Sequence, residues 1–202
     1  MNILLDTLAQ ICQTHCLGEK WLLVPTLRTG QQWLDRVALS GVPVVNARPK
    51  TVRGLAVALA EPEWLRRNLR RLDPLGGRLI VERIWNQGAP SGGGYLGSLT
   101  PSAGLFESMH ASLSALRLAG LTSVNPGGFE TSGKGSEILR LLREYQAFCQ
   151  QNSLADDADI LRMARDGIRQ SPSWFPGDVL LLIPDDLELS GLEREVIEAV
   201  PA

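Results

Sequence analysis

The sequence has 202 residues, of which 44% are hydrophobic and 21% are charged, the usual balance of a globular protein. Twenty basic residues against 22 acidic ones give a net charge of −2, without the basic excess typical of a free-standing nucleic-acid-binding module. No apolar run approaches the ~20 residues of a membrane helix, and the N-terminus lacks the basic start of a signal peptide. The three cysteines have no framework spacing, so we expect a reducing, cytoplasmic setting.

The first sixty residues alternate between helical and strand-like patterns. Apolar side chains at helical spacing predict a helix over residues 3–16, and Trp21–Thr26 follows as a short buried strand. A helix over residues 27–39, a second buried strand over Val42–Arg48 and a helix over Thr51–Ala60 complete this part. Short strands that alternate with helices predict a parallel sheet of the α/β class.

The pattern changes after this alternating part. From Glu61 to about Ser171 the sequence shows helical periodicity with almost no strand signal, and Gly177–Asp186 then returns to the strand pattern before a last helix. We expect an α/β core with a large all-helical insertion, and a sheet of about three strands in which the last lies beside the first two. So small a sheet leads us to expect a piece of a longer polypeptide. The expected divisions are 1–60 and 173–202 for the α/β part and 61–172 for the insertion.

Three stretches resemble, in chain order, motifs of superfamily 1 helicases of the UvrD/RecB kind. VPTLRTGQQWLDRV resembles the strand, loop and helix that contact single-stranded DNA, in the form found in the AddB-type subunit of helicase–nucleases. LADDADILRMA, Leu154 to Ala164, resembles the DF-x-DLL segment that closes the helical subdomain. VLLLIPDDLELSGLERE resembles the strand that carries DE-x-QD and the helix after it. The resemblance covers nearly the whole chain and implies a partial RecA-like sheet of the P-loop NTPase type.

The departures from this family predict a degenerate ATP site. Pro184 stands where the family has its magnesium-binding Asp, Asp185 where it has the catalytic Glu, and Leu187 where it has Gln. Proline has no carboxylate for a metal, and Asp185 is one methylene shorter than Glu. No G-x-x-x-x-G-K-[ST] precedes the first strand, so the phosphate-binding loop is missing. We therefore interpret Pro184, Asp185 and Asp186 as the remains of a site, and expect no catalytic residue, cofactor or metal in this chain.

Two other patterns imitate functional sites. Gly128–Gly135 matches G-x-x-x-x-G-K, but the hydroxyl residue, Ser136, comes one position late and turn-forming residues precede the match. We interpret this stretch as a linker in which Ser136 caps the next helix. Cys12, His15 and Cys16 have a helical spacing that can chelate a metal, but a structural zinc site needs four ligands, so core packing is the favoured interpretation.

Basic residues follow the first two predicted strands, where a parallel sheet would place them at its carboxyl edge. Arg28 follows the first strand, and Arg48, Lys50 and Arg53 follow the second. The carboxyl edge is where α/β proteins bind ligands, and the helicase family touches single-stranded DNA there. Together with Thr26, these residues are the candidate contacts to DNA phosphates, with ordinary loop-capping roles as the alternative.

Two further charged clusters have structural interpretations that we favour over functional ones. Four arginines are expected on one helix face, opposite leucines, where a solvated surface is a simpler role than tracking a phosphate backbone. They are Arg66, Arg67, Arg70 and Arg71. Asp156, Asp157 and Asp159 resemble a carboxylate cluster, of which Asp159 is expected to cap the following helix. The two histidines, His15 and His110, leave few options for a catalytic histidine.

The resemblance implies a role in DNA repair and recombination. AddB/RecB-like proteins carry a PD-(D/E)XK nuclease domain far downstream, so the parent protein would be an exodeoxyribonuclease while this part would be ATPase-inactive. We expect this part to act as a scaffold. Its partner would be single-stranded or end DNA, a helicase–nuclease partner subunit, or downstream domains of the same chain. We expect no membrane partner. One alternative is a protein-interaction domain without DNA contact, whose basic loops would be covered or neutralised by carboxylates. The other is an unconventional P-loop ATPase or helicase fragment that holds nucleotide and magnesium near Asp185.

Overall fold

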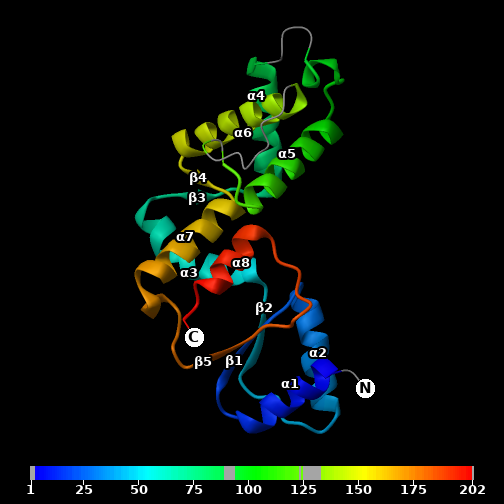
Figure 1. The fold of residues 1–202 in the computed structure, drawn as a ribbon, viewed down its shortest axis with the longest axis vertical. Helices are drawn as coiled ribbons and strands as arrows, with labels where there is room; N and C mark the ends of the chain where they lie inside the picture. The colour runs from blue at the N-terminus through cyan, green and yellow to red at the C-terminus, as the bar shows by residue number, and fades with distance from the viewer. Residues whose placement is uncertain (1–2, 89–93, 123, 125–132, 202) are drawn as a thin grey trace. The chain divides into compact units, whose positions relative to one another are not determined.

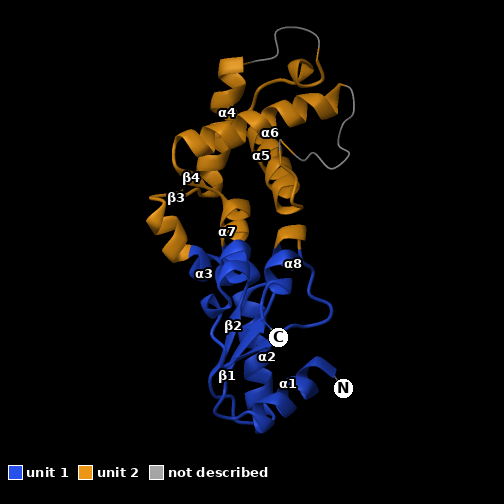
Figure 2. Ribbon diagram, turned by 60° about the vertical axis from the view of Figure 1, so that its left-hand side comes forward, with its two compact units in different colours: residues 1–60, 164–189, 193–202 blue, residues 61–163, 190–192 orange. Residues whose placement is uncertain are grey.

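The computed structural model describes residues 3–88, 94–122, 124 and 133–201 (Figure 1). These residues form an α/β protein that divides into two compact units, coloured separately in Figure 2. The first is the α/β unit, which consists of residues 1–60, 164–189 and 193–202. The second is the helical unit, which consists of residues 61–163 and 190–192. No helix in the described ranges has both the length and the apolar character needed to cross a membrane.

The α/β unit contains a small parallel sheet. It begins with α1 (Ile3–Thr14), β1 (Glu19–Leu23), α2 (Leu27–Leu39) and β2 (Ala47–Lys50), after which α3 (Val52–Arg66) starts. Its last strand, β5 (Val179–Leu182), follows the helical unit in the sequence and pairs with β1 in parallel. The strand order is β2-β1-β5, with Trp21 of β1 aligned with Arg48 on one side and Leu181 on the other. The predicted sheet of three parallel strands, with the last beside the first two, is confirmed.

The helices α1 and α2 pack on one face of this sheet (Figure 1). Leu22 of β1 and Val24, the residue directly after this strand, point to that face, because alternate residues of an extended chain point to the same side. They belong to a buried cluster that also contains Leu8, Cys12, Leu34 and Val37. Burial in this cluster raises the pKa of the Cys12 thiol, so Cys12 is a core residue here.

The second strand begins later than the apolar run predicts. The sequence pattern indicates a strand over Val42–Arg48, but β2 covers Ala47–Lys50 and the apolar run before it forms a loop. Asn46, with φ 52°, turns the chain just before the strand starts. Val42 and Val44 still pack against the cluster between the sheet and its helices. The apolar residues therefore reflect burial of a loop, which periodicity alone does not distinguish from a strand.

The helical unit is built on α4 (Pro74–Gly88), α5 (Ala103–Leu118) and α6 (Lys134–Gln151), with a short 3-10 turn, η1 (Leu96–Ser98). The apolar faces of these helices form one buried cluster, which explains the helical periodicity of this part of the sequence. Its most deeply buried members are Val81, Leu113, Leu142 and Tyr145. Two short strands that the sequence did not predict, β3 (Arg70–Arg71) and β4 (Leu154–Ala155), pair with each other in parallel.

Three helices pass from one unit into the other along the chain. They are α3, which passes the division after residue 60, α7 (Asp157–Gln170), which passes that after residue 163, and α8 (Gly191–Glu198). A 3-10 turn, η2 (Pro172–Trp174), precedes β5. The sequence places the later division at residue 172, where the helical pattern ends, whereas the structure has it inside α7. A continuous amphipathic helix shows no composition change at such a point, so the sequence does not mark it.

The four clustered arginines do not share a helix face, which corrects the interpretation above. α3 continues through Pro62 and ends at Arg66, and Asn68, with φ 53°, then redirects the chain. Arg66 and Arg67 both bond the carboxylate of Glu63, at 2.8 and 2.6 Å. The other two arginines form β3, and Arg71 pairs with Asp157 at 3.2 Å. Carboxylates therefore pair most of this charge.

Candidate nucleic-acid interface

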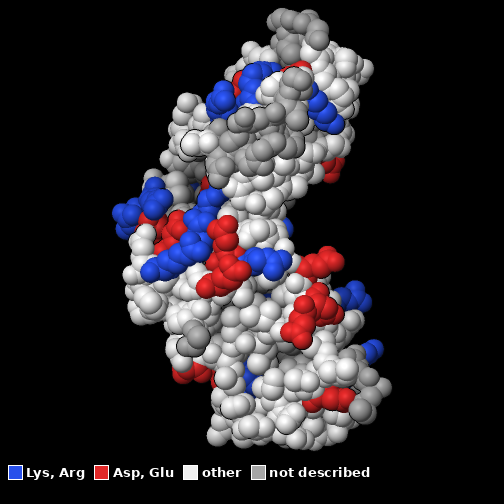
Figure 3. All heavy atoms as spheres, in the orientation of Figure 1, with Lys and Arg blue, Asp and Glu red and all other residues white. Residues whose placement is uncertain are grey.

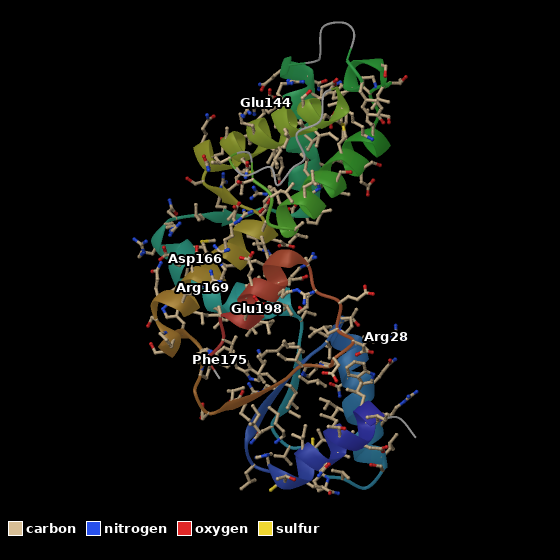
Figure 4. The ribbon with its side chains drawn as sticks, viewed as in Figure 1. Arg28, Glu144, Asp166, Arg169, Phe175 and Glu198 are labelled. Carbon is tan, nitrogen blue, oxygen red and sulfur yellow. The ribbon has the colours of Figure 1, made fainter. Side chains whose placement is uncertain are left out.

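The start of α2 lies at the carboxyl edge of the sheet, directly after β1. Thr26 is the N-cap of α2, and its hydroxyl accepts a hydrogen bond from the Thr29 N–H at 3.1 Å. The two threonine hydroxyls lie 2.9 Å apart. Arg28 is exposed in the first turn, labelled in Figure 4, and makes no ion pair with any residue in the described ranges. Two hydroxyls and an unpaired guanidinium therefore surround the amino end of a 13-residue helix.

Arg48 and Lys50 lie within β2, not in a loop after it, which corrects the sequence-based placement. The guanidinium of Arg48 lies 3.6 Å from the carboxylate of Glu19, at the amino end of β1. The ammonium of Lys50 lies 4.6 Å from the ring centroid of Trp21. Because β2 starts later than predicted, Arg48 lies inside the strand, whereas Lys50 is the last residue of β2 and lies at the carboxyl edge, aligned with Leu23 of β1.

Arg53 lies at the carboxyl edge, in the first turn of α3. Its Nε donates a hydrogen bond of 2.9 Å to the carboxylate of Glu193 on α8. The Glu193 side chain is 13% exposed and the Arg53 side chain is 46% exposed, so the pair is half sheltered from water. Of the five predicted contacts, the structure thus brings four to this edge: Thr26, Arg28, Lys50 and Arg53. Lys50 lies over the ring of Trp21 and a carboxylate partners Arg53.

The acidic pair after β5 forms a turn. The Leu187 N–H donates to the Pro184 carbonyl at 3.1 Å, which places Asp185 and Asp186 at the two central positions of a β-turn. Pro184 is buried and both aspartates are exposed. Nowhere in the described ranges do three or more His, Cys, Asp or Glu side chains gather as metal ligands would. The geometry of the acidic pair is therefore that of a surface turn.

Sequence reasoning missed Arg117, the most consequential charged residue of the helical unit. This arginine on α5 is 2% exposed, and it donates to both oxygens of Asp156 at 2.6 and 2.9 Å. A third contact joins it to Asp159 at 2.7 Å. The available signal was its position, four residues after Leu113 on the apolar face of a predicted helix.

The cap of α7 is Asp156, which corrects the prediction that Asp159 caps this helix. The Asp159 N–H donates to Asp156 Oδ1 at 3.0 Å, and Asp159 Oδ2 accepts from the Asp156 N–H at 3.4 Å. This reciprocal pair is a capping box, with Asp159 at the third helical position. Burial alone would raise the pKa of Asp156, but the hydrogen bonds and charge of Arg117 hold that pKa below its usual range.

The nucleophilic side chains of the helical unit are not activated. Burial raises the pKa of the Cys149 thiol to about 12 and raises the pKa of the Tyr145 phenol. Burial also lowers the pKa of His110, so the imidazole is neutral in the folded unit. The ring of His110 lies 6.0 Å from that of Tyr145, between α4 and α6. The Tyr145 hydroxyl is buried without a hydrogen-bond partner among the described residues, and the raised pKa values of Tyr145 and Cys149 keep both groups protonated near neutral pH.

The two patterns that resemble functional sites, the Cys12, His15 and Cys16 set and the G-x-x-x-x-G-K match, have structural roles in their described residues. His15 and Cys16 are exposed while Cys12 is buried, so the three side chains do not converge. Residues 128–132 of the G-x-x-x-x-G-K match lie outside the described residues. Gly133 is the N-cap of α6, and the Ser136 hydroxyl donates to the Gly133 carbonyl at 2.7 Å, so Ser136 is inside the helix and is not its cap.

No protein-family model matches this sequence, and no curated protein matches it. Figure 3 shows basic side chains beside acidic ones over the visible face, and neither unit presents an unbroken basic stripe there. What remains at the edge of the sheet is a small cluster, the hydroxyls of Thr26 and Thr29 with Arg28, which has the chemistry of a phosphate contact.

Proposed function

We propose that this chain is a non-catalytic, helicase-like domain similar to the N-terminal part of AddB/RecB-type proteins. Two features support this proposal. The helical unit interrupts the α/β unit between β2 and β5, the order that the motif resemblance implies. The turn at Pro184 leaves Asp185 and Asp186 in solvent, without the arrangement of a metal site. In this proposal the domain works as a scaffold in DNA repair or recombination and does not hydrolyse ATP.

The observation that carries DNA contact is the start of α2. Its free backbone N–H groups, the hydroxyls of Thr26 and Thr29 and the unpaired guanidinium of Arg28 offer several donors to one phosphate. Such contacts hold a strand in register and carry no sequence information. The proposed ligand is the backbone of single-stranded DNA, bound without preference for its sequence.

A second candidate function is supported by the neutralised cations. Arg48 pairs with Glu19, Arg53 pairs with Glu193, and Lys50 lies over the ring of Trp21. A DNA groove would keep such residues available to phosphates, because affinity for DNA comes mainly from free positive charge. Because these cations already have partners, the second candidate is a protein-interaction domain without DNA contact.

The test is fluorescence anisotropy of labelled single-stranded and duplex DNA over a salt series, with and without ATP and magnesium. We expect single-stranded binding that weakens as salt rises and is indifferent to ATP. Arg28→Ala should weaken it by roughly three- to ten-fold and reduce the salt slope by about 0.7. Arg48→Ala is the matched control, because Glu19 already pairs that charge, and it should change the affinity by less than about two-fold.

The other outcomes separate the candidates. Absence of binding at low salt contradicts DNA contact and leaves the protein scaffold. Equal losses from the two variants contradict the location at the start of α2. A dependence on ATP contradicts the degenerate site and supports the unconventional ATPase.

A further inference from the structure

The sheet of the α/β unit ends at β5 with an unpaired edge. No strand in the described ranges pairs with the side of β5 that faces away from β1. The directions of the N–H and C=O groups of β1 follow from its hydrogen bonds with β2, on the side away from β5. The Lys20 N–H donates to the Asn46 carbonyl at 2.8 Å and the Val24 N–H donates to the Lys50 carbonyl at 3.0 Å. Even-numbered residues of β1 thus face β2, and odd-numbered residues face β5.

The register then identifies the free groups on β5. Trp21 is aligned with Leu181, so its N–H and C=O reach Leu180 and Leu182, the neighbours of Leu181. Val179 and Leu181 consequently direct their N–H and C=O groups away from the sheet. The Val179 N–H lies 3.5 Å from the Pro176 carbonyl, which occupies it weakly. The free side is continued by Ile183, which is 41% exposed.

The opposite edge of the sheet, formed by β2, is protected against pairing with a further strand, unlike the edge formed by β5. On β2 the outward residues are Ala47 and Pro49, and proline has no N–H to offer. The same strand carries the charges of Arg48 and Lys50. Natural sheets use prolines and charges in this way to prevent pairing at an edge. The four residues of β5, VLLL, contain neither a proline nor a charge, and all four are only partly buried.

Acidic residues border β5 at both ends. Asp178 precedes the strand, and Asp185, Asp186 and Glu188 follow it, all of them exposed. No Lys or Arg occurs between residues 171 and 192. Pairing of β5 with a second copy would therefore bring like charges together. An antiparallel pair would set Asp178 of one copy near Asp185 of the other, and a parallel pair would align the same acids.

We propose that the free edge of β5 binds an extended segment of a partner protein, an apolar strand bordered by Lys or Arg. The backbone groups of Leu181 and Ile183 would pair with that strand, and alternate apolar side chains would cover β5. The basic borders would meet Asp178 at one end and the acidic turn at the other. This inference does not depend on DNA contact at α2.

The experiment uses the full chain and synthetic peptides. The probe is Lys-Val-Thr-Val-Thr-Val-Lys, compared with the same peptide bordered by Glu and with one whose central Val is Pro. Amide hydrogen exchange is followed by NMR. We expect the Lys peptide to slow exchange at Leu181 and Ile183 but not at Leu180 and Leu182, whose amides already face β1. The peptide bordered by Glu should bind roughly ten-fold more weakly.

Two variants make the test specific. Asp185→Lys with Asp186→Lys reverses charges on an exposed turn while Asp178 stays acidic, so it should remove most of the preference between the two peptides while the fold is retained. Leu181→Pro removes an outward N–H without touching the ladder to β1, and it should abolish binding. Three results would overturn the proposal: no protection by any peptide, equal binding whatever the borders, or concentration-dependent self-association that protects the same amides.

Discussion

At the scale of single residues, two buried cations, Arg117 and Lys20, are expected to contribute strongly to the stability of the fold. Arg117 is enclosed in the helical unit and bonded to Asp156 and Asp159. Removing one partner of a buried ion pair leaves the other charge without compensation. We expect Arg117→Ala to lower the free energy of unfolding of the helical unit by about 3–5 kcal/mol.

Arg140 provides the matched control, because its pair with Glu144 lies on the surface of the same unit at 2.9 Å (Figure 4 labels Glu144). Arg140→Ala should cost less than about 1 kcal/mol, since water screens an exposed pair. Urea denaturation of both variants measures the difference. Similar losses would show that Arg117 contributes no more than a surface ion pair.

Lys20 is the second buried cation, with a relative exposure of 0%. Its ammonium donates to the carbonyls of His15 and Gly18, at 2.5 and 2.6 Å, and so satisfies the turn that links α1 to β1. Lys20→Met keeps the apolar stem but removes the donor to both carbonyls, which leaves the His15 carbonyl with only the 3.2 Å bond from the Gly18 N–H. It should destabilise the α/β unit by about 2–4 kcal/mol. Lys50→Met, which removes only a contact with Trp21, should cost about 1 kcal/mol or less in the same denaturation experiment. An equal loss in the two variants would contradict the role of the two carbonyls.

At the scale of elements, the packing of α2 on the sheet depends on Gly30. A Cβ at this position would lie 2.4 Å from the Cβ of Pro49 on β2. Alanine favours a helix over glycine by about 1 kcal/mol, but the clash should outweigh that gain, so Gly30→Ala is expected to destabilise by about 1–3 kcal/mol. Gly104→Ala in α5 is the control, because a Cβ there meets nothing within 4 Å. That variant should stabilise by up to about 1 kcal/mol, and a stabilised Gly30→Ala would show that α2 can move away from the sheet.

His110 of α5 packs against Gly77 of α4, and this burial makes the helical unit sensitive to pH. Burial lowers the pKa of His110 in the folded state, although the charge of Asp156 opposes this shift. The unfolded chain, with a histidine pKa of about 6.5, then binds the proton more readily than the folded chain. The contribution of neutral His110 to the free energy of unfolding is therefore fully present above the unfolded pKa. It is lost as the pH falls towards the lower pKa of the folded state.

His110→Gln tests this dependence. Its free energy of unfolding should change less between pH 8 and pH 5 than that of the unaltered chain. Hydrogen exchange of the α4–α6 amides measures it. His15→Gln, at the exposed position directly after α1, is the matched control for replacing a histidine. A pH profile that is the same with and without His110 would contradict the assignment.

At the scale of the whole molecule, charge placement limits the functions that the chain can perform. The net charge is −2, and most of the cations predicted to contact DNA already have partners within the protein. Among the residues that the structure describes, Arg28 is the exception, and it lies beside the hydroxyls at the start of α2. The other open feature of the α/β unit is the acidic-bordered edge of β5. These two surfaces are on different parts of the same small sheet and can be tested separately.

Much of the fold could be predicted because its determinants are local. Apolar spacing identified the helices, and the runs at Trp21 and Val179 identified two of the three strands of the sheet. Prediction failed where local pattern and burial diverge. The valines before β2 are apolar because a loop is buried, and the arginines after α3 lie in a turn and a strand because the helix ends at Arg66. Burial of the loop decided the first case, and the turn at Asn68 with the pairing of β3 and β4 decided the second.

The sequence by itself determined the α/β class and the helical insertion, because residue type and spacing specify these. Only the tertiary structure decided which charges meet. Arg53 and Glu193 are 140 positions apart, and Arg117 and Asp156 are 39 apart. No periodicity relates residues at such separations, because their contact depends on how helices and strands pack. Hence the sequence could propose which cations bind DNA, while the fold decided that Arg28 alone among them has no partner in the part of the chain that the structure describes.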